Sequence, residues 1–364
     1  MESSDRNEEA IDNGTGDGLS RRTLLRNFGF GGAALALSLP AVAKVDKVMG
    51  GARPSVRDSA FPSHPKWKFV INYPFITIPF FVPMNYGGQD ASTLFNVSLQ
   101  VTGSQTGQVS DQIDAMNVGI AAGVDGMAVT MTDLHAFDAV TARALKAGIP
   151  VISINVDAPA SGRLAYLGQT PATAGFDAGE LMVSLVRKGE IAIFLNTPGI
   201  TDLEERQSGV VQAIKQSGKP ITYKVVASGS TPTAALAAIN AYYLGHPSLK
   251  GLCAVDSISA DAVAQVMKKY GLHAKGVSAG GFDLTPTMIQ AIENGNMDYT
   301  VDQQPYLMGF DGIEQLFLYK LSGGLMSPAD TNTGTKLVTK QNVGPYSYAD
   351  RFEGSSSKQK YPVS

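Results

Sequence analysis

Acidic and amide side chains recur directly after the short apolar segments of the sequence that are typical of β-strands. They are Asn155, Asp157, Asp256, Asp283 and Gln303. A carboxylate accepts hydrogen bonds from hydroxyl groups, and an amide both donates and accepts them. Arg206 adds a charged donor on a helical segment, and charged groups form the stronger hydrogen bonds. These residue types predict a binding site for a neutral molecule with several hydroxyl groups, such as a sugar or a polyol.

Two phenylalanines, Phe80 and Phe81, supply an apolar part for the same site. They lie in the stretch 74–88, where Pro79 and Pro83 argue against both a helix interior and a central strand. We therefore expect a loop whose exposed rings line a cleft and cover the flat C–H face of a sugar. Taken alone, each ring is more typical of a core position, and only the combination with the polar strand ends favours the site.

The acids also have a structural interpretation, because Asp and Asn often cap helices or occupy turns. Asp283 precedes the segment "LTPT" and Asp202 precedes "LEER", so either residue could cap the helix that follows. For a single acid the two interpretations stay open. The recurrence of polar residues after several strands, beside an aromatic segment, favours binding.

Strands and helices alternate along the chain, and this alternation is what positions these side chains. Strands are expected at 68–72, 97–101, 124–130, 150–155, 164–168, 190–196, 221–227, 249–255, 276–283 and 298–303, with helical patterns between them. Such a series predicts an α/β fold with two doubly wound parallel-sheet lobes, in which ligands bind beyond the carboxyl ends of the strands. A closed eight-stranded barrel is the alternative, and the polar break "DAPASGR" after residue 155 argues against it.

Composition excludes several other classes of protein. The 364 residues carry a net charge of −3 without a basic run in the body of the chain, so we expect no nucleic-acid partner. The single cysteine, Cys253, excludes an intrachain disulfide and is expected in the core. The histidines are scattered, and no P-loop motif occurs. We therefore expect no metal, no cofactor and no enzymatic activity.

The N-terminal segment predicts export. Arg21 and Arg22 precede an apolar run, residues 28–39, which ends near the cleavage pattern Ala41-Val42-Ala43. This arrangement resembles a twin-arginine signal peptide spanning residues 1–43. The apolar run is too short for a stable membrane anchor, so we expect a periplasmic protein without stable membrane insertion.

The mature chain resembles the periplasmic sugar-binding proteins of the ribose-binding type, the solute receptors of ABC importers, over residues 66–343. The matching segments are "PFF" (79–81), "AGIPVISINVDAP" (147–159), "EERQSGV" (204–210), "CAVDSISADAVA" (253–264), "GGFDLTP" (280–286), "YTVDQQP" (299–305) and "LVTKQNV" (337–343). The resemblance implies that these segments supply the aromatic, acidic, arginine and glutamine ligands of a sugar. Two departures set the chain apart from the ribose receptors. Asn155-Val156 replaces an Asp-Arg pair, and Ile78 stands where an asparagine is common.

The resemblance also implies a type I periplasmic binding protein with a three-segment hinge. The first lobe would comprise residues 66–168 and 304–335, and the second 169–303 and 336–348, preceded by a linker (44–65) and followed by a tail (349–364). The expected partners of this monomer are a neutral sugar or polyol and the membrane subunits of an ABC importer. A sugar- or nucleoside-processing enzyme, a sugar-responsive repressor and a receptor module on the same fold remain as alternatives.

Overall fold

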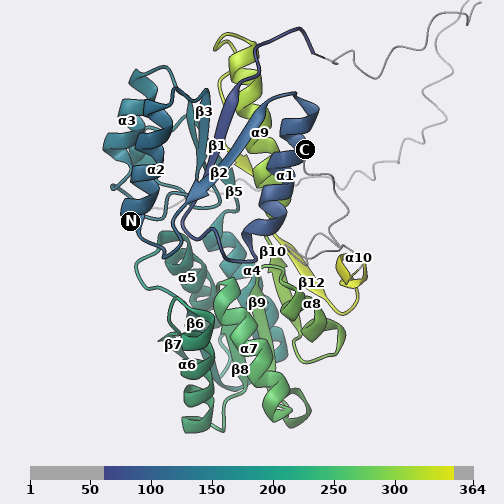
Figure 1. Cartoon of the computed structure of the whole chain (residues 1–364). Coiled ribbons are helices and arrows are strands. Elements are labelled where there is room, and N and C mark those ends of the chain that lie inside the picture. The colour runs from purple at the N-terminus through teal and green to yellow at the C-terminus, as the bar shows by residue number, and fades with distance from the viewer. Residues whose placement is uncertain (1–60, 348–364) are drawn as a thin grey trace, which may run out of the picture. The chain divides into compact units, whose positions relative to one another are not determined.

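The computed structural model describes residues 61–347, so the predicted signal peptide, most of the predicted linker and the predicted tail lie outside the described residues. Within this range the strands form two separate six-stranded sheets, each covered by helices on both faces (Figure 1). We call each sheet with its helices a lobe. The predicted α/β class with two doubly wound lobes is confirmed, and the single closed barrel is wrong, because both sheets are open.

The first lobe contains a fully parallel sheet with the strand order β11-β5-β4-β3-β1-β2. Its strands are β1 (Lys68–Tyr73), β2 (Ser98–Gly103), β3 (Gly126–Val129), β4 (Val151–Ile154), β5 (Tyr166–Gly168) and β11 (Thr331–Asn332). Its helices are α1 (Phe81–Leu94), α2 (Val109–Ala121), α3 (Asp138–Lys146), the 3-10 turn η1 (Pro159–Ser161) and α9 (Pro305–Leu321).

Successive side chains of β1 point to opposite faces of the sheet, and both faces are buried. Phe69, Ile71 and Tyr73 pack in the core beneath α1 and α9, whereas Val70 packs in the core on the α2 and α3 side. Since successive strand residues point to opposite faces, the nearly continuous apolar run "KFVIN" fits a strand covered on both sides. Helices α1 and α9, far apart in sequence, lie side by side on one face (Figure 1).

The second lobe has the strand order β12-β10-β9-β8-β6-β7, in which only the edge strand β12 is antiparallel to its neighbour. Its strands are β6 (Gly189–Leu195), β7 (Ile221–Ala227), β8 (Gly251–Ala254), β9 (Ser278–Phe282), β10 (Tyr299–Asp302) and β12 (Lys336–Thr339). Its helices are α4 (Pro171–Leu185), α5 (Thr201–Gln216), α6 (Pro232–Gly245), α7 (Ser257–Tyr270), α8 (Pro286–Glu293), α10 (Gly344–Ser347) and the 3-10 turn η2 (His273–Lys275). Cys253 is fully buried between these layers, as predicted.

Two glycines bring the backbones of α4 and α5 into contact. A Cβ atom built on Gly175 would lie 2.1 Å from the carbonyl oxygen of Arg206, and one on Gly209 would lie 2.3 Å from that of Ala172. No other residue type fits at this distance without moving a helix. The close packing therefore fixes the position of α5, which carries Arg206.

The chain passes from one sheet to the other three times, between β5 and α4, between β10 and α9, and between β11 and β12. The short connecting segments are residues 169–170, 303–304 and 333–335. Among the described residues, no helix is both long and apolar enough to cross a membrane.

One expectation at the N-terminal side of the first lobe is wrong. The stretch 74–88 is not a loop throughout, because α1 begins at Phe81 and contains Pro83 in its first turn. Backbone N–H groups of a first turn have no partner within the helix, so a proline there removes no hydrogen bond. Within the predicted linker, Phe61 and His64 pack their rings against Phe317 of the first lobe.

Candidate functional site

A cavity of about 80 Å3 lies where the carboxyl ends of strands from both sheets meet. Seven of the eight predicted binding residues line it, namely Phe80, Phe81, Asn155, Arg206, Asp256, Asp283 and Gln303. They come from segments that are up to 223 positions apart in the sequence, and the parallel topology brings them together. The eighth, Asp157, lies outside this inner cavity.

Gln303 connects the polar groups of the inner cavity. Its Oε1 accepts hydrogen bonds from Asn155 Nδ2 and from Arg206 Nη2, both over 3.1 Å. Its Nε2 donates to Asp283 Oδ1 over 2.5 Å. Because Gln303 is 1% exposed and lies in a segment between the lobes, it holds a first-lobe amide and second-lobe charges in one network.

Arg206 is buried in this network, with 2% of its surface exposed. Its Nη1 donates to the carbonyl oxygen of Val255 over 3.2 Å, its Nη2 lies 3.5 Å from Asp202 Oδ2, and the guanidinium carbon lies 4.8 Å from the centre of the Phe282 ring. Asp202 and Arg206 are four positions apart on α5, so their side chains share one face of the helix.

Two buried polar atoms of this ion pair have no hydrogen-bond partner among the described residues. They are Nε of Arg206, a donor, and Oδ1 of Asp202, an acceptor. A buried polar atom without a partner is costly, so each such atom in a folded protein calls for an explanation. Both residues line the inner cavity, so a polar ligand there could satisfy both atoms.

Asp283 directly follows β9 and has a left-handed backbone, with φ of +77°. The structure excludes its interpretation as a helix cap, because Thr285 caps α8 by accepting a hydrogen bond from the Met288 N–H. Burial raises the pKa of the Asp283 carboxyl from 3.8 to about 7, although Arg206 and the Gln303 amide act in the opposite direction. This acid therefore exchanges its proton near neutral pH.

Asp256 does serve as a helix cap. Its carboxylate accepts from the backbone N–H of Ser259 over 2.8 Å and from the Ser259 hydroxyl over 2.7 Å. It also accepts from Asn196, through the backbone N–H and through Nδ2. The capping interpretation is thus confirmed for Asp256, while the residue still lines the inner cavity. Burial raises the pKa of its carboxyl, and the four hydrogen bonds lower it.

The rings of Phe80 and Phe81 are buried, not exposed as expected, with 6% and 4% of their surfaces accessible. Phe81 stacks on Tyr73 at 4.4 Å between ring centres, and Phe80 meets Phe81 edge to face at 4.9 Å. Both rings belong to the first lobe's core and also form one wall of the inner cavity. The core interpretation is therefore confirmed, and the binding interpretation stays a prediction.

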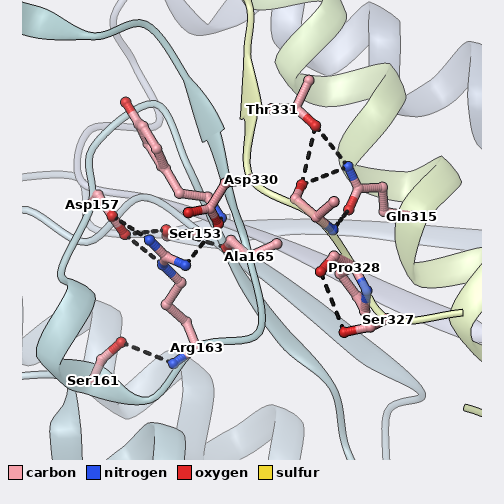
Figure 2. Close-up of polar contacts among 12 residues, drawn as sticks. Ser153, Asp157, Ser161, Arg163, Ala165, Gln315, Ser327, Pro328, Asp330 and Thr331 are labelled. Atoms are coloured by element: carbon pink, nitrogen blue, oxygen red, sulfur yellow. Dashed lines mark hydrogen bonds and ion pairs between the residues drawn. The ribbon is translucent and has the colours of Figure 1, made fainter.

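Asp157 has a different set of contacts. Its carboxylate accepts from Nε and Nη2 of Arg163 over 2.8 and 2.6 Å, and from the Ser153 hydroxyl over 2.5 Å. Figure 2 shows Arg163 reaching from Asp157 to Asp330, whose carboxylate also accepts from the backbone of Tyr166. The prediction grouped Asp157 with Asn155 because both follow β4. Asp157 instead binds Arg163, which lies just before β5 and also bonds Asp330, just before the edge strand β11.

Ten of the lining residues were not among the predicted site residues, and Asn196, Asp202 and Ile78 are three of them. Asn196 follows β6 directly, and Asp202 lies one helical turn before Arg206, so both could have been found from the strand-end and i,i+4 rules. Ile78 is apolar, so the search for polar residues after strands could not identify it. Its side chain packs against the cores of both lobes.

No group of three or more His, Cys, Asp or Glu side chains among residues 61–347 is arranged to hold a metal ion. Most polar contacts around the inner cavity link neutral amides, one guanidinium and carboxylates. Such a set is suited to hydroxyl groups.

The model of the periplasmic binding protein domain matches residues 69–323 of this chain. The chain is 38% identical over 314 residues to the xylose/arabinose-binding protein XylF of Sulfolobus acidocaldarius, covering 82% of this chain and 77% of that protein. The ribose import binding protein RbsB of Escherichia coli is 24% identical over 72% of this chain and 87% of its own length.

A solved ABC transporter solute-binding protein from Burkholderia graminis, in complex with D-arabinose, has a TM-score of 0.74 and 26% identity. The match covers 79% of this chain and 99% of that one. The chain therefore belongs to the periplasmic binding proteins, as a sugar-binding protein of the ABC-transporter type with the type I fold.

Proposed function

We propose that the protein binds an aldopentose, in the xylose and arabinose class, in the inner cavity and delivers it to the membrane subunits of an ABC importer. The names of its relatives motivate the choice of pentose, since one is a xylose/arabinose-binding protein and another was solved with D-arabinose. The expected ligand class from the sequence, a neutral monosaccharide or polyol, includes these sugars.

The observation that carries the proposal is the pair of unpartnered atoms, Arg206 Nε and Asp202 Oδ1. One is a donor and the other an acceptor, and a sugar hydroxyl can accept from the first while a hydroxyl donates to the second. Both residues are buried, with 2% and 6% of their surfaces exposed, so the two atoms have little contact with bulk water. A ligand with several hydroxyl groups thus restores hydrogen bonds that folding leaves unmade.

The proposed binding residues are Phe80, Phe81, Asn155, Asp202, Arg206, Asp256, Asp283 and Gln303. Phe80 and Phe81 would cover an apolar face of the sugar, and the polar residues would hold its hydroxyl rim. Asp157 is not among the proposed binding residues, because its carboxylate already accepts hydrogen bonds from Arg163 and Ser153.

We further propose that the connections near residues 168–169, 303–305 and 336 act as a hinge between the predicted lobes, 66–168 with 304–335 and 169–303 with 336–348. Closure around the sugar would exclude water and strengthen the hydrogen bonds of the site. The protein would act as a monomer without enzymatic activity, exported to the periplasm by a twin-arginine signal in residues 1–43.

A thermal-shift screen of aldopentoses, hexoses and polyols tests this function, because a ligand that binds only the folded state raises the melting temperature. We expect D-xylose or D-arabinose to give the largest rise. Arg206→Ala and Asp283→Ala should melt cooperatively and lose that rise, whereas Arg143→Ala, at an exposed arginine on α3 that bonds Asn117, should keep it. Full responses in both site variants would contradict the assigned site.

A further inference from the structure

A second and larger chamber lies beside the inner cavity. It has a volume of about 470 Å3, and it shares the lining residues Phe75, Ile78 and Ser257 with the inner cavity. We call it the outer chamber. Its remaining walls come from the segments after β2 and β7 and from the first turns of α7 and α8, so both lobes contribute to it.

The two volumes indicate that the inner cavity is only part of a binding site. Pockets for small molecules usually measure roughly 300–1,000 Å3. The inner cavity, at about 80 Å3, is well below this range, whereas the outer chamber, at about 470 Å3, falls within it. A ligand that fills both spaces would be larger than one sugar ring.

The lining of the outer chamber combines apolar faces with hydroxyl and amide groups. The apolar residues are Phe75, Ile78, Pro79, Pro232 and Ile258. The polar residues that belong to this chamber alone are Thr77, Gln105, Thr106, Ser230, Thr231, Asp261 and Thr285. A pyranose ring has the same two characters, an apolar C–H face and a rim of hydroxyls that both donate and accept.

A purely apolar ligand fits this lining less well. Asp261 is half-buried at the chamber wall, where its carboxylate accepts a hydrogen bond from the Thr285 hydroxyl. An apolar group placed over this carboxylate would remove water from it without replacing the lost hydrogen bonds, which costs free energy. A hydroxyl group can make those hydrogen bonds.

We propose that the outer chamber is a second sugar subsite, so that the protein accepts a disaccharide with one ring in the inner cavity and the other in the outer chamber. The proposal rests on the proposed function, because the inner cavity must hold the first ring. Ile78 lies at the junction of the two spaces and would pack against the glycosidic linkage.

Ser230 offers a way to block the outer chamber alone. It is exposed, follows β7, and lines the outer chamber but not the inner cavity. Ser230→Trp places a large ring in the chamber and leaves the inner residues unchanged. The matched control is Ser248→Trp, at an exposed serine just before β8, at the opposite end of the same sheet.

The test is isothermal titration of the mature protein and both variants with D-xylose, D-arabinose, xylobiose and cellobiose, after circular dichroism has shown that the variants fold. We expect a disaccharide to bind the unmodified protein at least as tightly as the better monosaccharide. Ser230→Trp should weaken disaccharide binding about tenfold or more and change monosaccharide binding less than about twofold. Ser248→Trp should change neither.

Binding of monosaccharides without either disaccharide would overturn the second subsite and leave the proposed function intact. Disaccharide binding that is unaffected by Ser230→Trp would also overturn it, because the second ring would then lie elsewhere. If none of the four sugars binds, the proposed function and the second subsite both fail.

Discussion

Nη2 of Arg206, on α5, donates a hydrogen bond over 3.1 Å to Oε1 of Gln303, which lies in the segment between β10 and α9. Asn155, at the end of β4 in the first lobe, donates to the same oxygen. One amide oxygen therefore joins a cation of the second lobe to an amide of the first. A change at Gln303 should affect the fold and the site together.

Gln303→Ala should lower the free energy of unfolding by about 1–3 kcal/mol, because Arg206 and Asn155 would each lose a buried hydrogen-bond partner. Sugar affinity should fall in parallel, since the guanidinium would no longer be held in place. Urea unfolding and isothermal titration measure the two effects. The control is Gln265→Ala, at an exposed position of α7, which should change neither value. An unchanged sugar affinity in Gln303→Ala would contradict this role.

The stability of the ligand-free protein should decrease as pH rises from about 4 to about 7. In the folded protein the pKa of Asp283 is raised to about 7, so the carboxyl keeps its proton within this window. In the unfolded chain its pKa is 3.8, so the carboxyl loses the proton there. The stability that Asp283 contributes is thus fully present below the pKa of the unfolded state. It is lost as pH rises through the pKa of the folded state. Melting temperatures between pH 4 and pH 8 test this, and Asp283→Asn should flatten the dependence.

Sugar binding should show the opposite pH dependence. A sugar hydroxyl that donates to Asp283 favours the ionised carboxylate, so binding releases a proton and becomes tighter as pH rises from about 5.5 to 8. Calorimetry in two buffers of different ionisation enthalpy measures the released proton. A proton release of the same size in Asp283→Asn would show that another group titrates.

Asp157→Asn should lower stability and leave sugar affinity within about twofold of the unmodified protein, because its carboxylate holds Arg163 and does not face the inner cavity. We expect a loss of about 1.5–3 kcal/mol, the range for a hydrogen bond to a charged group. Chemical unfolding and titration with the sugar separate the two roles. A large loss of affinity at unchanged stability would place Asp157 in the site after all.

Gly209→Ala should force α4 and α5 apart and cost about 1–3 kcal/mol of stability, the usual range for overpacking. Because Arg206 lies on α5, sugar affinity should fall as well. Gly245→Ala is the matched control, since nothing lies within 4 Å of a Cβ built at the end of α6. Equal stability in the two variants would contradict the close helix contact.

Replacing both Arg21 and Arg22 with lysine should prevent export if residues 1–43 are a twin-arginine signal. The measurement is the distribution of the protein between periplasmic and cytoplasmic fractions of a host with this pathway. The matched change is Arg26→Lys, outside the arginine pair, which should leave export intact. Normal export of the double variant would remove the twin-arginine assignment.

Sequence patterns predicted most of this fold because the alternation of apolar strands and helices is local information. The strand that ends near Gln303 and the helix that carries Arg206 are examples, and parallel topology then gathers their ends at one place. The prediction for Pro83 was wrong because a proline in the first turn of a helix cannot be told, from the sequence alone, from a proline that breaks a helix.

The roles of the acids depended on tertiary contacts. Asp256 and Asp283 both follow strands, but only Asp256 caps a helix, since Thr285 serves that purpose beside Asp283. The pairing of Asp157 with Arg163 also depends on a loop conformation that no periodicity encodes.

The most direct test of the central claim is a crystal structure of the protein with D-xylose or D-arabinose bound. We predict that the sugar occupies the inner cavity, with oxygen atoms within hydrogen-bond distance of Arg206 Nε and Asp202 Oδ1, the two atoms without partners in the free protein. A bound sugar that lies elsewhere, or that leaves both atoms without a hydrogen bond, would contradict the account.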